Sequence, residues 1–152
     1  MLELKLPSEA STLRLGEALA AGAAPGTVLF ISGDLGAGKT TLVRGLLRAL
    51  GYAGRAKSPT YALVEPYELS RLHLYHFDFY RFKDRSEWLN SGFREHFNPG
   101  SLCVVEWPEK AGDLLSPPDL HIKLDFDGQA RRARLEALSA SGRSWLSSLQ
   151  LR

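Results

Sequence analysis

The sequence predicts an α/β fold in which a mainly parallel sheet is flanked by helices, with added antiparallel strands and a C-terminal hairpin. The apolar segment Thr27 to Ile31 runs directly into a glycine-rich loop and then into a helical pattern from Lys39 to Leu50. A second wholly apolar run, Leu102 to Val105, is typical of a parallel strand buried on both faces. Alternating segments on either side of Asp127-Gly128 predict the hairpin.

The N-terminal part predicts a strand and then a helix. Leucines alternate with polar residues over 2–6, which indicates a short, half-buried strand. Ser11 or Thr12 is a candidate N-cap for a helix that Gly22 closes. In the helix that follows the glycine-rich loop, leucine and valine recur at helical spacing, and Gly51 is placed just after its C-terminus.

The second half predicts strands with little helix. Tyr61 to Val64 and Leu72 to Tyr80 look like strands with no helix between them, so we expect an antiparallel pair that extends the sheet. Apolar residues alternate over 122–126 and again over 133–137, which gives the two arms of the hairpin. Trp145 and Leu146 lie on one face of a last short helix. Without any linker or repeat, residues 1–152 are expected to form a single domain.

Composition and charge exclude several classes of protein. The chain is 44% hydrophobic and 24% charged, which is ordinary globular usage and excludes a disordered or fibrous protein. A net charge of +2 does not favour extensive nucleic-acid binding, although five arginines after residue 130 leave a local basic patch open. The single cysteine, Cys103, is expected to be a buried, inert thiol. The N-terminus lacks a secretory signal and no apolar run could span a bilayer, so we expect a cytoplasmic protein without a membrane partner.

The strongest chemical signal is the loop GDLGAGKT at residues 33–40. Its pattern is glycine, four residues, glycine, lysine and a hydroxyl residue, which is the P-loop of nucleoside triphosphatases. Glycine allows positive φ angles and lets backbone N–H groups approach phosphate oxygens. The α/β fold should therefore be of the P-loop NTPase type, with these nucleotide-binding residues: Gly33, Asp34, Leu35, Gly36, Ala37, Gly38, Lys39, Thr40 and Thr41.

Three residues at the end of this loop have distinct expected roles. The Lys39 ammonium is expected on the β- and γ-phosphates and the Thr40 hydroxyl on the Mg²⁺ ion that bridges them. Thr41 adds a hydroxyl for the α-phosphate.

A GTPase motif is matched only superficially, by Asp125 to Gly128. This segment makes a better hairpin turn, and the chain has no guanine-reading motif.

A P-loop enzyme needs a further carboxylate at the end of a neighbouring strand, to hold the metal or its water. Glu106 ends the apolar run 102–105, where the carboxyl edge of the sheet binds ligands. Asp78 shares a strand face with His76 and Tyr80, and His76 is a candidate to orient it. Both acids are therefore predicted to be catalytic and to assist at the metal.

A third motif, Ser58-Pro59-Thr60, lies between the P-loop helix and the next strand. P-loop enzymes keep a mobile segment there that senses the γ-phosphate, and Thr60 would offer its hydroxyl to Mg²⁺ or to the attacking water. The alternative is a turn that proline stiffens. From the residues alone both interpretations stay open.

Taken together, the motifs resemble the TsaE family, also known as YjeE, the P-loop ATPases of bacterial tRNA threonylcarbamoyladenosine (t6A) synthesis. The resemblance covers most of the chain. The matching segments are Thr12 with Leu15-Gly16, the loop GDLGAGKTT, SPTY at 58–61, HFDFYR at 76–81 and VVEWPE at 104–109.

The resemblance implies ATP and Mg²⁺ as ligands and supports the roles given above to Lys39, Thr40, Thr60 and the two acids. It further implies that Trp107 and Thr12 lie near the nucleotide. The implied partners are TsaB and TsaD, a transferase pair that places a threonylcarbamoyl group on adenosine 37 of tRNAs reading codons that begin with A. ATP hydrolysis would reset that complex, so tRNA would be met indirectly or through the complex.

Two other function classes share the P-loop. A small-molecule P-loop kinase would need an arginine-bearing lid and an acceptor pocket, for which a chain of 152 residues has little room. A nucleotide-sensing module would bind without turnover. Slow ATP hydrolysis that partner proteins activate is the preferred interpretation.

Overall fold

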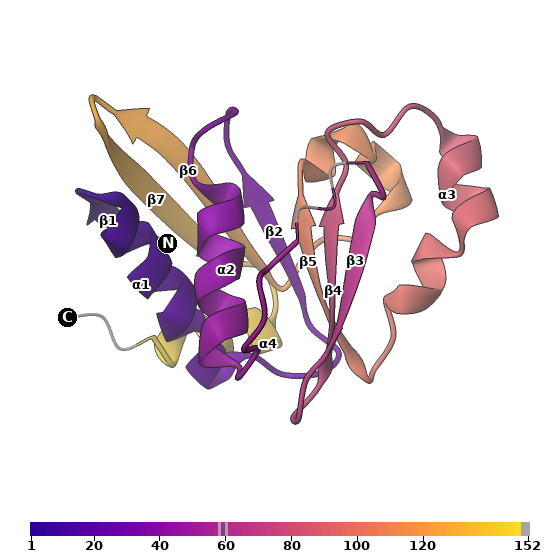
Figure 1. Ribbon diagram of the computed structural model, residues 1–152, viewed down its shortest axis with the longest axis horizontal. Coiled ribbons are helices and arrows are strands. Elements are labelled where there is room, and N and C mark those ends of the chain that lie inside the picture. Colours follow the sequence, from indigo (N-terminus) through magenta and orange to yellow (C-terminus); the bar gives the residue numbers. More distant parts are fainter. Residues whose placement is uncertain (58, 60, 150–152) are drawn as a thin grey trace.

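The computed structural model describes residues 1–57, 59 and 61–149, and these residues form one seven-stranded sheet with helices around it (Figure 1). The strand order is β1-β7-β6-β2-β5-β4-β3. The strands are β1 (Leu2–Leu6), β2 (Val28–Ser32), β3 (Val64–Glu68), β4 (His73–Asp78), β5 (Ser101–Glu106), β6 (Leu120–Asp127) and β7 (Ala130–Ala137).

The centre of the sheet is parallel and both edges are antiparallel, as the sequence predicted. Strand β2 pairs in parallel with both β5 and β6, and β5 pairs in parallel with β4. Strand β3 runs antiparallel to β4 at one edge, while β6, β7 and β1 form an antiparallel set at the other. The hairpin turn consists of Gly128 and Gln129, one residue beyond the predicted Asp127-Gly128, and Gly128 has a φ of 62°.

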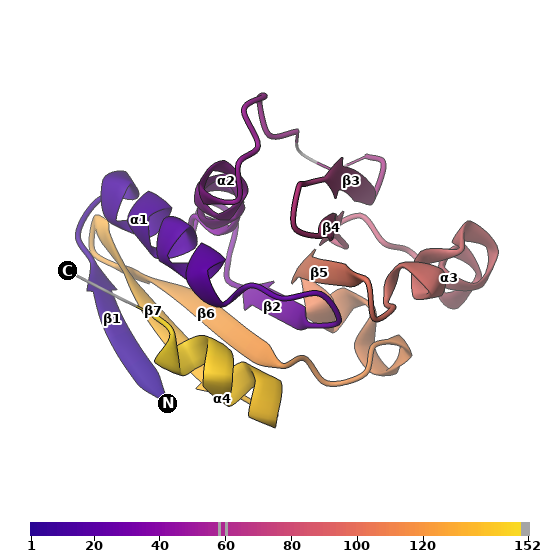
Figure 2. The same ribbon diagram turned by 90° about the horizontal axis from the view of Figure 1, so that it is seen from below.

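In the part of the chain that the structure describes, four α-helices pack around the sheet: α1 (Glu9–Leu19), α2 (Lys39–Ala49), α3 (Arg85–Ser91) and α4 (Ala140–Ser147). Figure 2 shows α1 and α2 side by side on one face. Strand β5 alternates between two cores, because Leu102 and Val104 join the cluster under α1 and α2 while Cys103 and Val105 join the aromatic cluster under α3. The sheet is thus buried on both faces at its centre.

Three element boundaries differ from the prediction. The cap of α1 is Ser8, whose side chain accepts from Ser11 N, so Ser11 and Thr12 lie inside the helix. The predicted strand 61–64 was misplaced, because Leu63 has a left-handed φ of 68° and β3 runs from Val64 to Glu68. Strand β4 ends at Asp78, whose side chain accepts from the next-but-one backbone N–H and turns the chain.

Helix α3 was not predicted. Its signal is an N-cap, Asp84, whose carboxylate accepts from the N–H groups of Ser86 and Glu87, and a left-handed Gly92 at its C-terminus. Among the described residues no helix has the length and apolar character needed to cross a membrane.

Candidate nucleotide-binding site

The glycine-rich loop connects the end of β2 with the start of α2, at the carboxyl edge of the parallel strands. Its backbone needs glycine at two positions in particular. Gly38 caps α2 with a left-handed φ of 107°, which leaves the first N–H groups of the helix open toward the pocket. At Gly33 a Cβ atom would lie 2.6 Å from the Leu124 carbonyl oxygen, so only glycine fits between the loop and β6.

The side chain of Lys39 is folded back onto its own loop. Its Nζ atom donates to the carbonyl oxygens of Gly33 at 2.5 Å and Asp34 at 2.9 Å, and lies 4.4 Å from the ring centroid of Trp107. Burial lowers the pKa of Lys39, while the carboxylates of the site, first Glu106 and then Asp78, act in the opposite direction. This ammonium is well desolvated and is held by uncharged oxygens and a π face.

The two predicted carboxylates meet at the ends of neighbouring strands. Asp78 ends β4 and Glu106 ends β5, and the two residues lie opposite each other in the parallel register. Both are buried, and burial raises the pKa of Asp78, an effect to which the nearby charge of Glu106 adds. The Thr40 hydroxyl donates to the Glu106 oxygens at 3.4 and 3.5 Å. Thr40, Asp78 and Glu106 are thus brought together as the sequence predicted.

His76 has a different partner from the one that sequence reasoning suggested. It is buried on β4, and its Nε2 atom lies 2.5 Å from Oε2 of Glu106, whereas the Asp78 carboxylate accepts from the backbone of Tyr80. The reason is the register: His76 pairs with Val104, so the end of β5 brings Glu106 diagonally across to the imidazole. The expectation that His76 orients Asp78 was therefore wrong.

A pocket of about 430 Å³ opens in front of these groups. Trp107 stands at its wall in a left-handed conformation, with φ of 56°, next to the Tyr80 ring. Trp107 therefore lies beside the glycine-rich loop, and its nearness to a bound nucleotide stays a prediction. The residues that line the pocket are Leu35, Gly36, Gly38, Lys39, Thr40, Thr41, Asp78, Tyr80, Arg81, Glu106 and Trp107. The predicted Thr60, together with Ser58, lies outside the described residues.

A second pocket, of about 290 Å³, lies on the other side of the same loop. Thr12 lines it from α1, and a Cβ atom on Gly38 would stand 3.3 Å from the Thr12 methyl carbon. Arg131 lines it from β7, where its Nη2 atom donates to the Gly36 carbonyl oxygen at 3.1 Å and its guanidinium stacks on Phe126. Thr12 is therefore close to the loop, and its place beside a nucleotide stays a prediction.

Sequence reasoning did not select Arg131 as a site residue. It counted this residue only among the C-terminal arginines, because its approach to the loop depends on the pairing of β7 with β6. Its neighbours Arg132 and Arg134 instead pair across the hairpin with Asp127 and Asp125 at 3.4 and 3.3 Å. These opposite charges compensate one another, which favours a solvated face.

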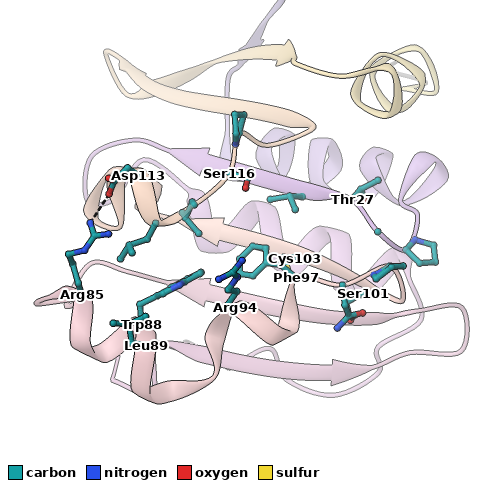
Figure 3. A pocket seen from close by; sticks show the side chains of 18 residues that line it. Thr27, Arg85, Trp88, Leu89, Arg94, Phe97, Ser101, Cys103, Asp113 and Ser116 are labelled. Carbon is teal, nitrogen blue, oxygen red and sulfur yellow. Dashed lines mark hydrogen bonds and ion pairs between the residues drawn. The ribbon is translucent and has the colours of Figure 1, made fainter.

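A larger pocket, of about 920 Å³, lies away from this site at the amino ends of β2 and β5 (Figure 3). Arg85 and Asp113 form an ion pair of 2.8 Å at one end of it. Cys103 lies at its floor, where burial raises the pKa of the thiol to about 12, in agreement with the predicted inert cysteine.

Known proteins resemble this chain along most of its length. A family model described as "Threonylcarbamoyl adenosine biosynthesis protein TsaE" matches residues 6–134. A Haemophilus influenzae protein named tRNA threonylcarbamoyladenosine biosynthesis protein TsaE is 40% identical over 147 residues, which cover 93% of each chain. A Bacillus subtilis protein of the same name is 39% identical over 121 residues, covering 80% of this chain and 75% of its own.

The fold has a counterpart among solved structures. The crystal structure of Bacillus subtilis YdiB matches 96% of this chain and 91% of its own chain with a TM-score of 0.78 and 28% sequence identity. The family model and the relatives agree with the motifs and with the site they form, and the chain therefore belongs to the TsaE family.

Proposed function

We propose that this chain binds ATP with Mg²⁺ and hydrolyses it slowly, in support of a TsaB–TsaD complex that attaches a threonylcarbamoyl group to adenosine 37 of tRNAs reading codons that begin with A. The observation that carries the nucleotide part is the meeting of Lys39 and Thr40 with two buried carboxylates at one edge of the sheet. Membership of the TsaE family supports the process in which ATP is used.

Phosphate binding would require Lys39 to leave its resting position. Its present acceptors are two neutral carbonyl oxygens, and phosphate oxygens are stronger acceptors for an ammonium because both partners are charged. The N–H groups at the start of α2 face the same pocket and favour anions. The triphosphate is therefore expected along the loop, with its terminal group toward Lys39.

The donor set in the pocket fits Mg²⁺, which prefers hydroxyl, carboxylate and phosphate oxygens. Thr40 and Glu106 would hold the ion, and Asp78 would hold one of its waters or orient the attacking water. Among the described residues no group of three or more His, Cys, Asp or Glu side chains could hold a metal alone. The ion should accordingly need the phosphates, because it would share their charge and oxygens when bound.

The second pocket supplies the remainder of the proposed site. The loop separates it from the first pocket, and both are lined by Gly36, Gly38 and Thr41. A nucleotide whose phosphates follow the loop would bring its nucleoside end toward Thr12 and Arg131. Thr60 remains a predicted γ-phosphate sensor.

Exposed apolar side chains gather around these two pockets, which supports a role within an assembly. Tyr61 is 84% exposed, Leu35 61% and Phe126 49%, and exposed apolar side chains that cluster, unlike scattered ones, are typical of interaction sites. Leu35 lines the first pocket, Tyr61 stacks on Arg81 at its mouth, and Phe126 supports Arg131 at the second. A partner that docks here would cover the nucleotide and these side chains together.

The test measures phosphate release from ATP by the purified chain, alone and with purified TsaB and TsaD. We expect slow release alone and faster release with both partners, and no labelled γ-phosphate on any acceptor. Lys39→Ala should abolish triphosphate binding, whereas Lys123→Ala, an exposed lysine outside both pockets, serves as the matched control. Rapid hydrolysis that the partners do not change would contradict the coupling.

A second measurement addresses the biological role. In a reconstituted t6A reaction, omission of this chain or its replacement by Lys39→Ala should stop repeated turnover of the transferase. The Lys123→Ala protein should sustain it. Equal t6A yields over many turnovers with either variant would refute the proposed support role while leaving ATP binding intact.

A further inference from the structure

We propose that His76 is a positioning residue that holds the Glu106 carboxylate toward Thr40 and thereby governs the Mg²⁺-dependent part of nucleotide binding. This inference rests on the proposed function, because it concerns how the chain binds its metal–nucleotide complex. It assigns to His76 a task that neither its sequence motif nor its strand face had indicated.

The geometry places Glu106 between two side chains from different elements. On one side the His76 imidazole reaches Oε2 at 2.5 Å from β4, and on the other the Thr40 hydroxyl lies 3.4 Å from the same oxygen. His76 and Glu106 are 1% and 2% exposed, so water does not substitute for either contact. The short contact to histidine is therefore the main restraint on the carboxylate.

Packing alone does not explain why position 76 carries an imidazole. The Nδ1 atom of His76 is buried and has no hydrogen-bond partner among the described residues. A buried polar atom without a partner costs free energy, whereas leucine or methionine would fill similar space without that cost. What the imidazole adds is its Nε2–H donor, and the acceptor of that donor is Glu106.

The Lys39 ammonium is a cation that attracts the Glu106 carboxylate, so the position of this carboxylate depends on the His76 contact. Among the carboxylates, the charge of Glu106 acts most strongly on the pKa of Lys39, and that of Asp78 acts next. A Glu106 carboxylate without a fixed donor would be drawn toward the Lys39 ammonium, away from Thr40. The His76 contact therefore keeps the carboxylate available for the metal and leaves Lys39 available for phosphate.

His76 acts through Glu106 and not as a ligand of the ion. Its Nε2 atom is already engaged, and Mg²⁺ is a hard cation that prefers oxygen. Hydrogen-bond donors that orient a metal-binding side chain without contacting the metal contribute to metal affinity. Removing such a donor typically lowers that affinity by about 10- to 100-fold.

The experiment compares ATP binding by calorimetry with Mg²⁺ and with EDTA, for the full chain, four single variants and one double variant. The amide nitrogen of His76→Gln can occupy the place of Nε2, while His76→Asn keeps an amide that is too short to reach it. His76→Leu removes the donor, and Glu106→Gln removes the charge that it holds. Thermal unfolding of each protein shows whether it folds.

We expect His76→Leu and His76→Asn to weaken MgATP binding by about 10-fold or more. The affinity for ATP in EDTA should change by less than about twofold. A general distortion of the loop would lower the affinity in both conditions. His76→Gln should recover most of the MgATP affinity. Combining His76→Leu with Glu106→Gln should add little to the loss from Glu106→Gln alone, because both changes act on one interaction.

Three results would overturn the inference. One is an equal loss with and without Mg²⁺, which would mark a merely structural role. Another is an MgATP affinity of His76→Gln as low as that of His76→Asn. This comparison can be made even if the leucine variant does not fold. The third is an additive effect in the double variant. If the unmodified chain does not bind ATP in either condition, the proposed function itself fails, which is a separate and recognisable outcome.

Discussion

Gly45→Ala is expected to destabilise the protein although alanine is the better helix former. Gly45 lies inside α2, where a Cβ atom would stand 2.2 Å from the carbonyl oxygen of Leu13 in α1. Real Cβ contacts are not found below 3.0 Å, so α1 and α2 must move apart. The helix itself gains up to about 1 kcal/mol from alanine, whereas forced overpacking costs about 1–3 kcal/mol. Because the clash is with backbone and very short, its cost belongs in the upper part of that range, about 2–3 kcal/mol, and the net loss should be about 1–2 kcal/mol.

Urea unfolding followed by far-ultraviolet circular dichroism measures this loss. With a slope of about 2 kcal/mol per molar urea, the midpoint should fall by roughly 0.5–1 M. Arg44→Ala compared with Arg44→Gly, at an exposed position inside the same helix, measures the helix-propensity part alone. A Gly45→Ala protein as stable as the original, with unchanged slope, would mean that the two helices are not in backbone contact here.

A second glycine makes the prediction sharper. Gly16 in α1 would bring a Cβ atom 2.1 Å from the carbonyl oxygen of Leu42 in α2, so the two helices approach through one glycine each. A single separation of the helices relieves both clashes. The free-energy loss of Gly16→Ala combined with Gly45→Ala should therefore be smaller than the sum of the two single losses.

Three further predictions concern other parts of the chain. Cys103, whose thiol pKa is raised to about 12 by burial, should not react with a disulfide reagent at pH 8 until denaturant is added; full reaction in native buffer would contradict its burial. Asp119→Ala should lower the free energy of unfolding by about 1–3 kcal/mol, because the Asp119 carboxylate accepts hydrogen bonds from Val28 N and from Ser139, the N-cap of α4. Urea unfolding measures this loss, and calorimetry should show an unchanged ATP affinity. Addition of ATP should change tryptophan fluorescence because Lys39 leaves the Trp107 ring, and a change that persists in Trp107→Phe would refute this assignment.

The predictable part of the site consists of what is local in the chain. The strand, glycine-rich loop and helix are contiguous, so residues 27–50 alone identified the phosphate-binding segment. Glu106 was identified because parallel strands present their last residues at one edge, whichever strands are neighbours. Asp78 was selected by the strand face that it shares with His76, and the structure places it at the end of β4. Neither prediction required the strand order.

The parts that sequence reasoning missed depend on pairing and register. The His76 contact exists because β4 lies beside β5 with Val104 opposite His76, and a shift of one residue would turn the imidazole to the other face. Arg131 reaches the loop because β7 pairs with β6 next to β2. The N-cap of α1 was misplaced because Ser8, Ser11 and Thr12 are all plausible caps, and only the direction of the chain after β1 selects the first.

The strand order also accounts for the chemical asymmetry of the site. Strand β2 is central, with β5 on one side and β6 on the other, so the loop that follows it has a different neighbour on each flank. On the β5 side stand the buried carboxylates, and on the β6 side stands the guanidinium of Arg131. In the proposed function the metal would use the carboxylates, so the γ-phosphate end of a triphosphate is expected on the β5 flank, which leaves the β6 flank for the nucleoside. The same central position that buries β2 would then set the direction of a nucleotide along its loop.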